Sequence, residues 1–272
     1  MDFKKWRIYI NYVLLISLVA LILGGCGPDK SPQPTTEPPA PTPASIAPEP
    51  TATDTADTDD SDDTAVPPEE GDGYFDDAVF IGDSVSLKLR NYVTQRRAAD
   101  AGYLGNAEFL VSGSLGSGNA LWEIKDDSVH PAYNGEKMLL EDGVSKSGAK
   151  KLYIMLGVND IVVYGIGGSV ENMGKLLDNI KQKSPGIEIF VQSVLPVTRN
   201  GQKDKLNNAA LSEYNEGLIE LCSQNGYEYL DVASVIKDAE GYLPDEYSSD
   251  DFVHLTDEAC ELWIDYLRDH KK

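Results

Sequence analysis

Short apolar runs alternate with longer amphipathic stretches along the chain from about residue 74 onward. The short runs are continuously apolar, which is typical of parallel strands whose two faces are both covered. We therefore predict a parallel sheet. The runs expected to form strands are Val79–Gly82, Glu108–Val111, Leu152–Leu156, Ile187–Val194 and Tyr227–Val232.

Each apolar run precedes a stretch that favours a helix. The helices expected are Val85–Val93, Asn119–Ile124, Ser169–Lys183, Leu206–Gln224 and Asp257–Leu267. Strand–helix alternation repeated five times predicts an α/β fold, a three-layer α/β/α sandwich, for residues 74–272. The stretch Lys125–Gly148 is an insertion in this pattern, for which we expect a loop and one helix, Gly135–Asp142.

The first 26 residues have the pattern of a targeting segment rather than of a fold. Three basic residues precede the apolar run Tyr12–Leu23, and small residues lead up to Cys26. This ending resembles a bacterial lipobox, which implies cleavage before Cys26 and lipidation of its thiol. We expect a lipid-anchored domain on the outer side of a bacterial membrane. An ordinary signal peptide or anchor helix with an incidental cysteine is the alternative.

Residues 27–73 are rich in proline, threonine and aspartate, a composition that cannot build a core. We expect a disordered spacer between the anchor and the domain. The spacer holds much of the net charge of −22. The chain shows no basic stripe with interleaved aromatic residues, which argues against a nucleic-acid partner.

Two further cysteines, Cys222 and Cys260, fall in expected helices. A location outside the cytoplasm would permit a disulfide, but cysteines on apolar helix faces are more often simply buried. No histidine lies near either cysteine in the sequence, so we expect no metal site from them.

Candidate chemistry begins at Gly82-Asp83-Ser84, which closes the first apolar run. A serine between a strand and a helix places its hydroxyl at the positive end of the helix dipole. The backbone N–H of Ser84 can also face a developing oxyanion there. The alternative is that Ser84 only caps the helix, a role that serine favours.

A histidine and a carboxylate follow near the end of the chain, at Asp251 and His254. A carboxylate three residues before a histidine can orient the imidazole toward a serine. The alternative is a solvated acidic loop, to which Asp250 also belongs. The other histidines are less suitable, because His130 lies in the insertion and His270 at the C-terminus.

Two loops at expected strand ends offer oxyanion donors. Asn159 follows the Leu152–Leu156 run, and its amide could donate to a tetrahedral oxyanion. The glycine-rich loop after Glu108–Val111 could present a backbone N–H at Gly113 or Gly116; of the two, we select Gly116 because it lies later in the loop. Both loops could equally be plain turns.

Together these segments resemble the SGNH hydrolases, the GDSL esterase/lipase superfamily. The resemblance extends from Val79 to about Thr256, and the first block has Val85 where leucine is usual. The matching blocks are Gly82-Asp83-Ser84, Gly113-Ser114-Leu115-Gly116, Gly157-Val158-Asn159-Asp160 and Asp251-Phe252-Val253-His254.

The resemblance implies a flavodoxin-like fold with a five-stranded parallel sheet and no metal or organic cofactor. It also implies that Ser84 is the nucleophile, His254 the general base and Asp251 its orienting partner. The oxyanion hole would comprise the N–H groups of Ser84 and Gly116 and the side chain of Asn159.

From these features we expect a cell-surface esterase that removes acyl groups, such as acetyl, from carbohydrate or cell-wall polymer. A lysophospholipase is the enzymatic alternative, and it would need an apolar acyl channel, for which Leu115, Val162, Val163 and Tyr164 are candidates. An acyltransferase is also within the range of the superfamily. From another class, the domain could be an inactive binding module or structural lipoprotein, although four intact site residues argue against that.

Overall fold

The computed structural model describes residues 71–272, so the expected signal peptide, Cys26 and nearly all of the expected spacer lie outside the described residues. Five parallel strands form the main sheet in the order β2-β1-β5-β6-β7, which confirms the predicted parallel sheet. The strands are β1 (Ala78–Gly82), β2 (Glu108–Val111), β5 (Lys151–Met155), β6 (Glu188–Gln192) and β7 (Glu228–Leu230).

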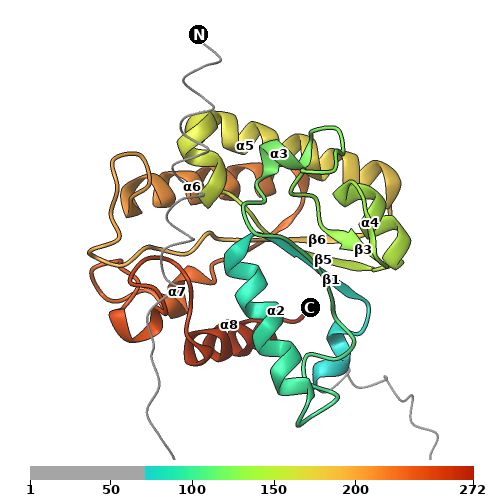
Figure 1. The fold of residues 1–272 in the computed structure, drawn as a ribbon, viewed down its shortest axis with the longest axis horizontal. Coiled ribbons are helices and arrows are strands. Elements are labelled where there is room, and N and C mark those ends of the chain that lie inside the picture. The colour runs from blue at the N-terminus through green and yellow to red at the C-terminus, as the bar shows by residue number, and fades with distance from the viewer. Residues whose placement is uncertain (1–70) are drawn as a thin grey trace, which may run out of the picture. The chain divides into compact units, whose positions relative to one another are not determined.

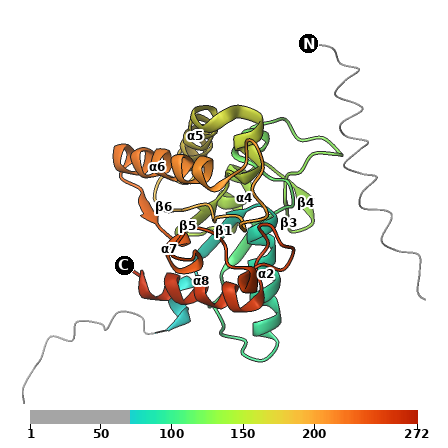
Figure 2. The same ribbon diagram turned by 90° about the vertical axis from the view of Figure 1, so that its left-hand side faces the viewer.

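Helices cover both faces of this sheet (Figures 1 and 2). Helices α4, α5 and α6 lie on one face, and α2 and α8 lie on the other. The α/β/α sandwich predicted from the alternation is therefore confirmed. The helices are α2 (Ser84–Arg97), α3 (Ser117–Ala120), α4 (Leu140–Ser147), α5 (Val158–Lys183), α6 (Asn208–Asn225), α7 (Ala233–Ile236) and α8 (Asp257–Asp269), with 3₁₀ turns η1 (Asp72–Phe75) and η2 (Asp245–Tyr247).

A row of aromatic rings crosses four neighbouring strands and fixes their register. Phe109, Phe80, Tyr153 and Phe190 are register partners on β2, β1, β5 and β6. Their ring centroids are 5.1, 4.8 and 4.6 Å apart in that order, and all three pairs are stacked. Such pairs contribute about 0.5–1.5 kcal/mol each beyond the burial of their area. The carboxyl ends of β1 and β5, from which the candidate site extends, are therefore in register, with Gly82 opposite Met155.

The insertion differs from its expected structure. The stretch Gly135–Asp142 was expected to be one helix, but residues 132–137 form a hairpin of β3 (Ala132–Tyr133) and β4 (Glu136–Lys137), and α4 begins only at Leu140. The reason is the Asn134-Gly135 pair, both of whose φ angles are positive, as a tight two-residue hairpin turn requires. The helix expected at Asn119–Ile124 is also wrong, because α3 ends at Ala120.

Helix α5 begins eleven residues before the expected Ser169. Its first section, residues 158–164, is separated from the rest by a kink at Gly165, whose φ of 69° is non-helical. Glycines at 165, 167 and 168 hide this first section from a reading based on apolar periodicity, because each weakens the helical signal.

The two termini of the described residues are joined by an ion pair. Asp72, which falls in the expected spacer, binds the guanidinium of Arg268 through two bonds of 2.8 Å and accepts the N–H of Leu104 at 2.7 Å. The domain therefore includes Asp72 as well as residues 74–272. Every helix within residues 71–272 is too short or too polar to span a lipid bilayer.

Both cysteines among the described residues are free and buried. Cys222 lies in α6 and Cys260 in α8, helices that cover opposite faces of the sheet. The sheet between them prevents a disulfide, which confirms simple burial as the better of the two expectations.

Candidate active site

Ser84 opens helix α2 directly beyond the carboxyl end of β1, but it is not the helix cap. The N-cap is Asp83, whose carboxylate accepts the N–H of Val85 at 2.9 Å. The turn is tight at Gly82, where a Cβ would lie 1.9 Å from the Ser86 hydroxyl and 3.1 Å from the Met155 carbonyl. Because Asp83 caps the helix, the hydroxyl of Ser84 is left for another partner, and the capping role considered for Ser84 is wrong.

That partner is His254, in the loop before α8. Its Nε2 lies 2.9 Å from the Ser84 Oγ, across 170 positions of sequence. Its Nδ1 lies 2.5 Å from a carboxylate oxygen of Asp250. The three side chains form the serine–histidine–carboxylate relay needed to activate a serine nucleophile. The structure thus brings together Ser84 and His254, as the sequence predicted.

The carboxylate in this relay corrects the prediction, which named Asp251. Asp251 is exposed, has a left-handed φ of 57°, and contributes only its backbone carbonyl, which accepts the Thr198 hydroxyl at 2.7 Å. The left-handed residue reverses the chain, so the loop folds around the preceding carboxylate. One Asp250 oxygen accepts the N–H groups of Phe252, Val253 and His254 at 3.0–3.1 Å.

These hydrogen bonds keep Asp250 ionised. Partial burial alone would raise the pKa of Asp250, but the bonds from the His254 side chain and from the loop backbone lower it below its ordinary value. A carboxylate that stays charged can orient the imidazole and stabilise its protonated form.

Asn159 lies in the first turn of α5, half-buried at the end of β5. Its Nδ2 donates to the carbonyl of Leu115 at 2.9 Å. This bond orients the amide and occupies one of its two hydrogens, since a carboxamide carries two donors. The second hydrogen is available to a ligand, in agreement with the role expected of Asn159.

Gly116 does not suit the role predicted for it. Its N–H donates to the side-chain oxygen of Asn119 at 2.9 Å, and a Cβ at Gly116 would lie 2.7 Å from Asp160. The position is therefore a helix start packed on a buried carboxylate, and its N–H is already used.

Gly113 is the better donor among the two glycines considered. The neighbouring Ser112 donates its N–H to the Gly82 carbonyl at 3.2 Å, which places Gly113 beside the strand end that leads into Ser84. Gly113 is exposed, and no atom lies within 4 Å of where its Cβ would be. No hydrogen bond within residues 71–272 occupies its N–H.

Asp160 holds the glycine-rich loop against α5, a role that the sequence did not reveal. Its buried carboxylate accepts the N–H groups of Ser117 and Gly118, both at 2.8 Å. Burial raises the pKa of Asp160 although these two bonds oppose the shift. The Gly157-Val158-Asn159-Asp160 block drew attention only to Asn159, because nothing in its pattern indicates that the neighbouring carboxylate accepts backbone N–H groups of another loop.

The other histidines have structural roles. His130 is buried and bonds the Ala120 carbonyl at 3.1 Å and the Ser128 hydroxyl at 3.0 Å. His270 stacks on Tyr266 near the C-terminus. Within the described part of the chain, no group of histidine, cysteine or acidic side chains has an arrangement that could hold a metal ion.

Comparison with known proteins agrees with this geometry. Residues 80–262 match the GDSL-like lipase/acylhydrolase family. No curated protein matches the chain. Similar solved structures include a GDSL-like lipase from Bacteroides thetaiotaomicron (TM-score 0.51, 13% identity, covering 71% of this chain and 85% of that one). A carbohydrate esterase family 3 protein from Talaromyces cellulolyticus has a TM-score of 0.50 at 15% identity, covering 71% and 94%.

A third structure is the periplasmic domain of a lipopolysaccharide acetyltransferase from Salmonella Paratyphi A. Its TM-score is 0.50 at 15% identity, and the match covers 71% of this chain and 82% of that one. At these identities the three structures establish the shared fold.

Proposed function

Because the chain belongs to the GDSL-like lipase/acylhydrolase family, an SGNH hydrolase family, we propose that it is a serine esterase that acts outside the cytoplasm on short acyl esters, such as acetyl groups, of carbohydrate. The observation that carries the proposal is the relay from Ser84 through His254 to Asp250. An inactive binding module would have no use for such a relay.

In the proposed reaction, the Ser84 Oγ attacks the ester carbonyl while His254 Nε2 accepts the hydroxyl proton. Asp250 stabilises the imidazolium through Nδ1. The tetrahedral intermediate collapses to an acyl-serine as His254 returns the proton to the leaving alcohol. A water molecule, deprotonated by His254, then releases the acid and restores Ser84.

The oxyanion of the intermediate needs donors beside Ser84. The N–H of Ser84 at the start of α2, the N–H of Gly113 and the free amide hydrogen of Asn159 are positioned at the carboxyl ends of β1, β2 and β5. Fixed donors of this kind stabilise the transition state more than the ground state, because they point to where charge develops.

Substrate size is argued from the residues expected to form an acyl channel. Leu115 is fully buried in the core, whereas Val162 and Val163 are exposed. These residues therefore do not line a common enclosed channel, which favours a short acyl group. Structures that share this fold include a carbohydrate esterase and an acetyltransferase that acts on lipopolysaccharide.

The test is a series of p-nitrophenyl esters from acetyl to dodecanoyl, assayed with the full chain in mild detergent beside acetylated xylan. We expect kcat/KM to be highest for acetyl and to fall with chain length, with acetate released from the polysaccharide. Acyl transfer to an added alcohol in preference to water would instead identify an acyltransferase. No turnover of any ester would contradict the proposal.

A lysophospholipase is the second candidate, and one observation favours it. Trp122, Val162 and Val163 are exposed apolar side chains, and the two valines lie one helical turn after Asn159. An apolar surface beside the site could receive a long acyl chain. Rising kcat/KM from acetyl to dodecanoyl in the same series would support this candidate.

Membrane attachment is the remaining part of the proposal and rests on the sequence around Cys26. Cleavage before Cys26 and lipidation of its thiol would hold the domain at a membrane surface, with residues 27–71 as the spacer. We expect the wild-type chain to incorporate labelled fatty acid in an expressing bacterium and Cys26→Ala to incorporate none. Equal incorporation by both chains, or none by the wild type, would contradict lipidation at Cys26.

A further inference from the structure

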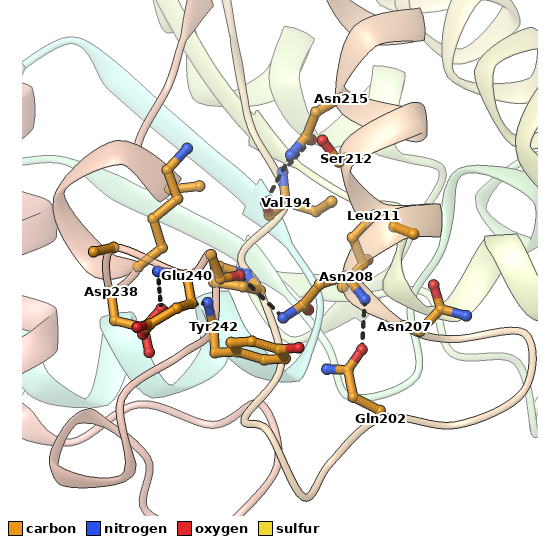
Figure 3. A pocket seen from close by; sticks show the side chains of 16 residues that line it. Val194, Gln202, Asn207, Asn208, Leu211, Ser212, Asn215, Asp238, Glu240 and Tyr242 are labelled. Atoms are coloured by element: carbon orange, nitrogen blue, oxygen red, sulfur yellow. Dashed lines mark hydrogen bonds between the residues drawn. The ribbon is translucent and has the colours of Figure 1, made fainter.

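A cavity lies away from the catalytic side chains, where the loop after β6 meets the start of α6 and residues 237–242 (Figure 3). Its volume is about 590 Å³, which falls within the range of small-molecule pockets. None of Ser84, Asp250, His254 or Asn159 lines it. The reaction proposed above leaves it without a role.

The walls of this cavity are held rigid by side-chain amides. Asn215 bonds both the N–H and the carbonyl of Val194, at 2.9 and 3.0 Å. Asn208 does the same for Val197, at 2.8 and 3.0 Å, and also donates to the Gly241 carbonyl. Both amides tie the loop after β6 to α6, and Asn208 also ties α6 to residue 241, so the cavity is formed before any ligand arrives. Preformed walls reduce the ordering cost of binding.

The remaining polar groups are of mixed character. Ser212, Lys237 and Glu240 line the cavity and are exposed. A hydroxyl, an ammonium and a carboxylate together favour a neutral ligand with several hydroxyl groups, because the ammonium donates to a ligand hydroxyl, the carboxylate accepts from one and the serine hydroxyl can do either. A phosphate would be repelled by the Glu240 carboxylate. A long alkyl chain would bury these polar groups without giving them hydrogen-bond partners.

Tyr242 supplies an aromatic surface. Its ring lies between the carboxylates of Asp238 and Glu240 on one side and the amides of Asn208 and Gln202 on the other (Figure 3). The guanidinium of Arg199 lies 4.1 Å from the ring centroid. Arg199 lines an adjoining cavity of about 280 Å³ that shares Tyr242 and Asp238, but not the larger cavity. Arg199 therefore orders the ring from the side of the smaller cavity.

One loop connects the larger cavity to the active site. Val194, Pro196 and Gln202 of this loop line the cavity. Thr198, in the same loop but outside the cavity lining, donates its N–H to the Phe252 carbonyl at 2.9 Å and its hydroxyl to the Asp251 carbonyl at 2.7 Å. The segment that carries Asp250 and His254 is thus bonded to the loop that supplies one wall of the cavity. A polymer with one unit at Ser84 could place another unit in the cavity.

We infer that this cavity is a binding subsite for a neutral sugar unit of the substrate polymer, with Tyr242 as the aromatic surface and Ser212 and Lys237 among the hydroxyl-binding groups. Its identification as a sugar site rests on the proposed function. An aromatic face beside hydrogen-bonding side chains suits the apolar C–H face and the hydroxyl groups of a pyranose. The subsite would give preference for oligosaccharides over single sugars.

The test is direct binding of oligosaccharides that carry no ester group, so that it does not depend on catalysis. The full chain carrying Ser84→Ala would be titrated by calorimetry with xylohexaose, cellohexaose and chitohexaose. In that background, Ser212→Trp would fill the cavity from an exposed position of α6. Ser223→Trp, the same change at an exposed position of the same helix outside the cavity, is the matched control.

We expect at least one hexasaccharide to bind the Ser84→Ala chain and its Ser223→Trp derivative equally. Ser212→Trp should weaken that binding at least tenfold, and Tyr242→Ala should do likewise, with a melting temperature close to that of the control. Failure of all three sugars to bind, or equal binding by the Ser212→Trp and Ser223→Trp chains, would overturn the subsite. Failure of the esterase proposal would appear separately, as absence of ester turnover in the wild-type chain.

Discussion

The hydroxyl of Ser84 is available to His254 because the neighbouring Asp83 caps the helix that Ser84 opens. Because Asp83 supplies the capping oxygen, a serine at the start of this helix is free to act in catalysis instead of capping the helix. This arrangement also shows what sequence can supply at this scale. Ser84, His254 and Asn159 could be predicted, since each follows a strand or precedes a helix with a clear apolar pattern.

Two residue assignments could not be predicted, because each depends on local backbone conformation. The choice between Asp250 and Asp251 turns on one left-handed φ, at Asp251. The choice between Gly113 and Gly116 turns on whether the Asn119 side chain occupies an N–H. The two aspartates are adjacent and the two glycines lie three positions apart in one loop, so the sequence alone does not show which of each pair acts in the site.

The orienting acid is the first prediction at this scale. Asp250→Asn should lower kcat on the order of 10⁴-fold. Without the carboxylate, the His254 imidazole is no longer held in the tautomer whose Nε2 can accept a proton, and its protonated form is no longer stabilised. Asp251→Asn, the matched control, should change kcat little, since only its backbone carbonyl is engaged. Steady-state kinetics on p-nitrophenyl acetate would decide, and the opposite order of effects would restore Asp251 as the acid.

The oxyanion donor is the second prediction. Asn159→Ala should cost roughly 2.7–4 kcal/mol of transition-state stabilisation, and the loss should fall on kcat rather than KM. The variant also loses the bond to the Leu115 carbonyl, a contribution of about 1 kcal/mol to stability. Kinetics and thermal melting on one purified sample separate the two effects. A lowered melting temperature with unchanged kcat would make Asn159 purely structural.

At the scale of elements, helix starts determine the site. Helix α2 presents Ser84, the first section of α5 presents Asn159 and Asp160, and the loop before α8 presents His254. Asp160 ties the start of α5 to α3 through two backbone N–H groups. The early start of α5 and the hairpin of the insertion were not predicted, because glycine-rich and short segments carry little periodicity.

The start of α2 has a pH-dependent stability. Burial raises the pKa of Asp83 to about 6, above its ordinary value of 3.8, so between these values the folded state binds more protons than the unfolded state. The contribution of Asp83 to stability is therefore complete below about pH 4 and is lost as pH rises through about 6. Asp83→Asn keeps a side-chain oxygen that can cap the helix but cannot ionise, so its contribution to stability should not fall as pH rises.

We expect the free energy of unfolding of Asp83→Asn, relative to wild type, to increase by up to ~3 kcal/mol between pH 4 and pH 7, the equivalent of about two pKa units. Urea unfolding at several pH values measures this difference. Asp127→Asn, an exposed aspartate in the insertion, should show no such trend. A difference that stays flat with pH for Asp83→Asn would contradict the raised pKa.

At the scale of the whole molecule, sheet order brings the site together. Strands β1 and β5 are neighbours at the centre of the β2-β1-β5-β6-β7 sheet, so segments around residues 84, 113 and 159 meet at one edge. The parallel strands and their alternation with helices could be predicted from the sequence, because buried strands are continuously apolar. The cavity at the start of α6 could not be predicted, since it is assembled from loops and from amides that bond distant backbone groups.

The central claim, that Ser84 is an activated nucleophile, is tested most directly by covalent labelling of the full chain with a fluorophosphonate probe. Mass spectrometry of the labelled protein should place the adduct on the peptide containing Ser84. Ser84→Ala should remain unlabelled, and Ser86→Ala, a serine in the same helix turn, should label like the wild type. Equal labelling of Ser84→Ala, or an adduct at any other residue, would contradict the account.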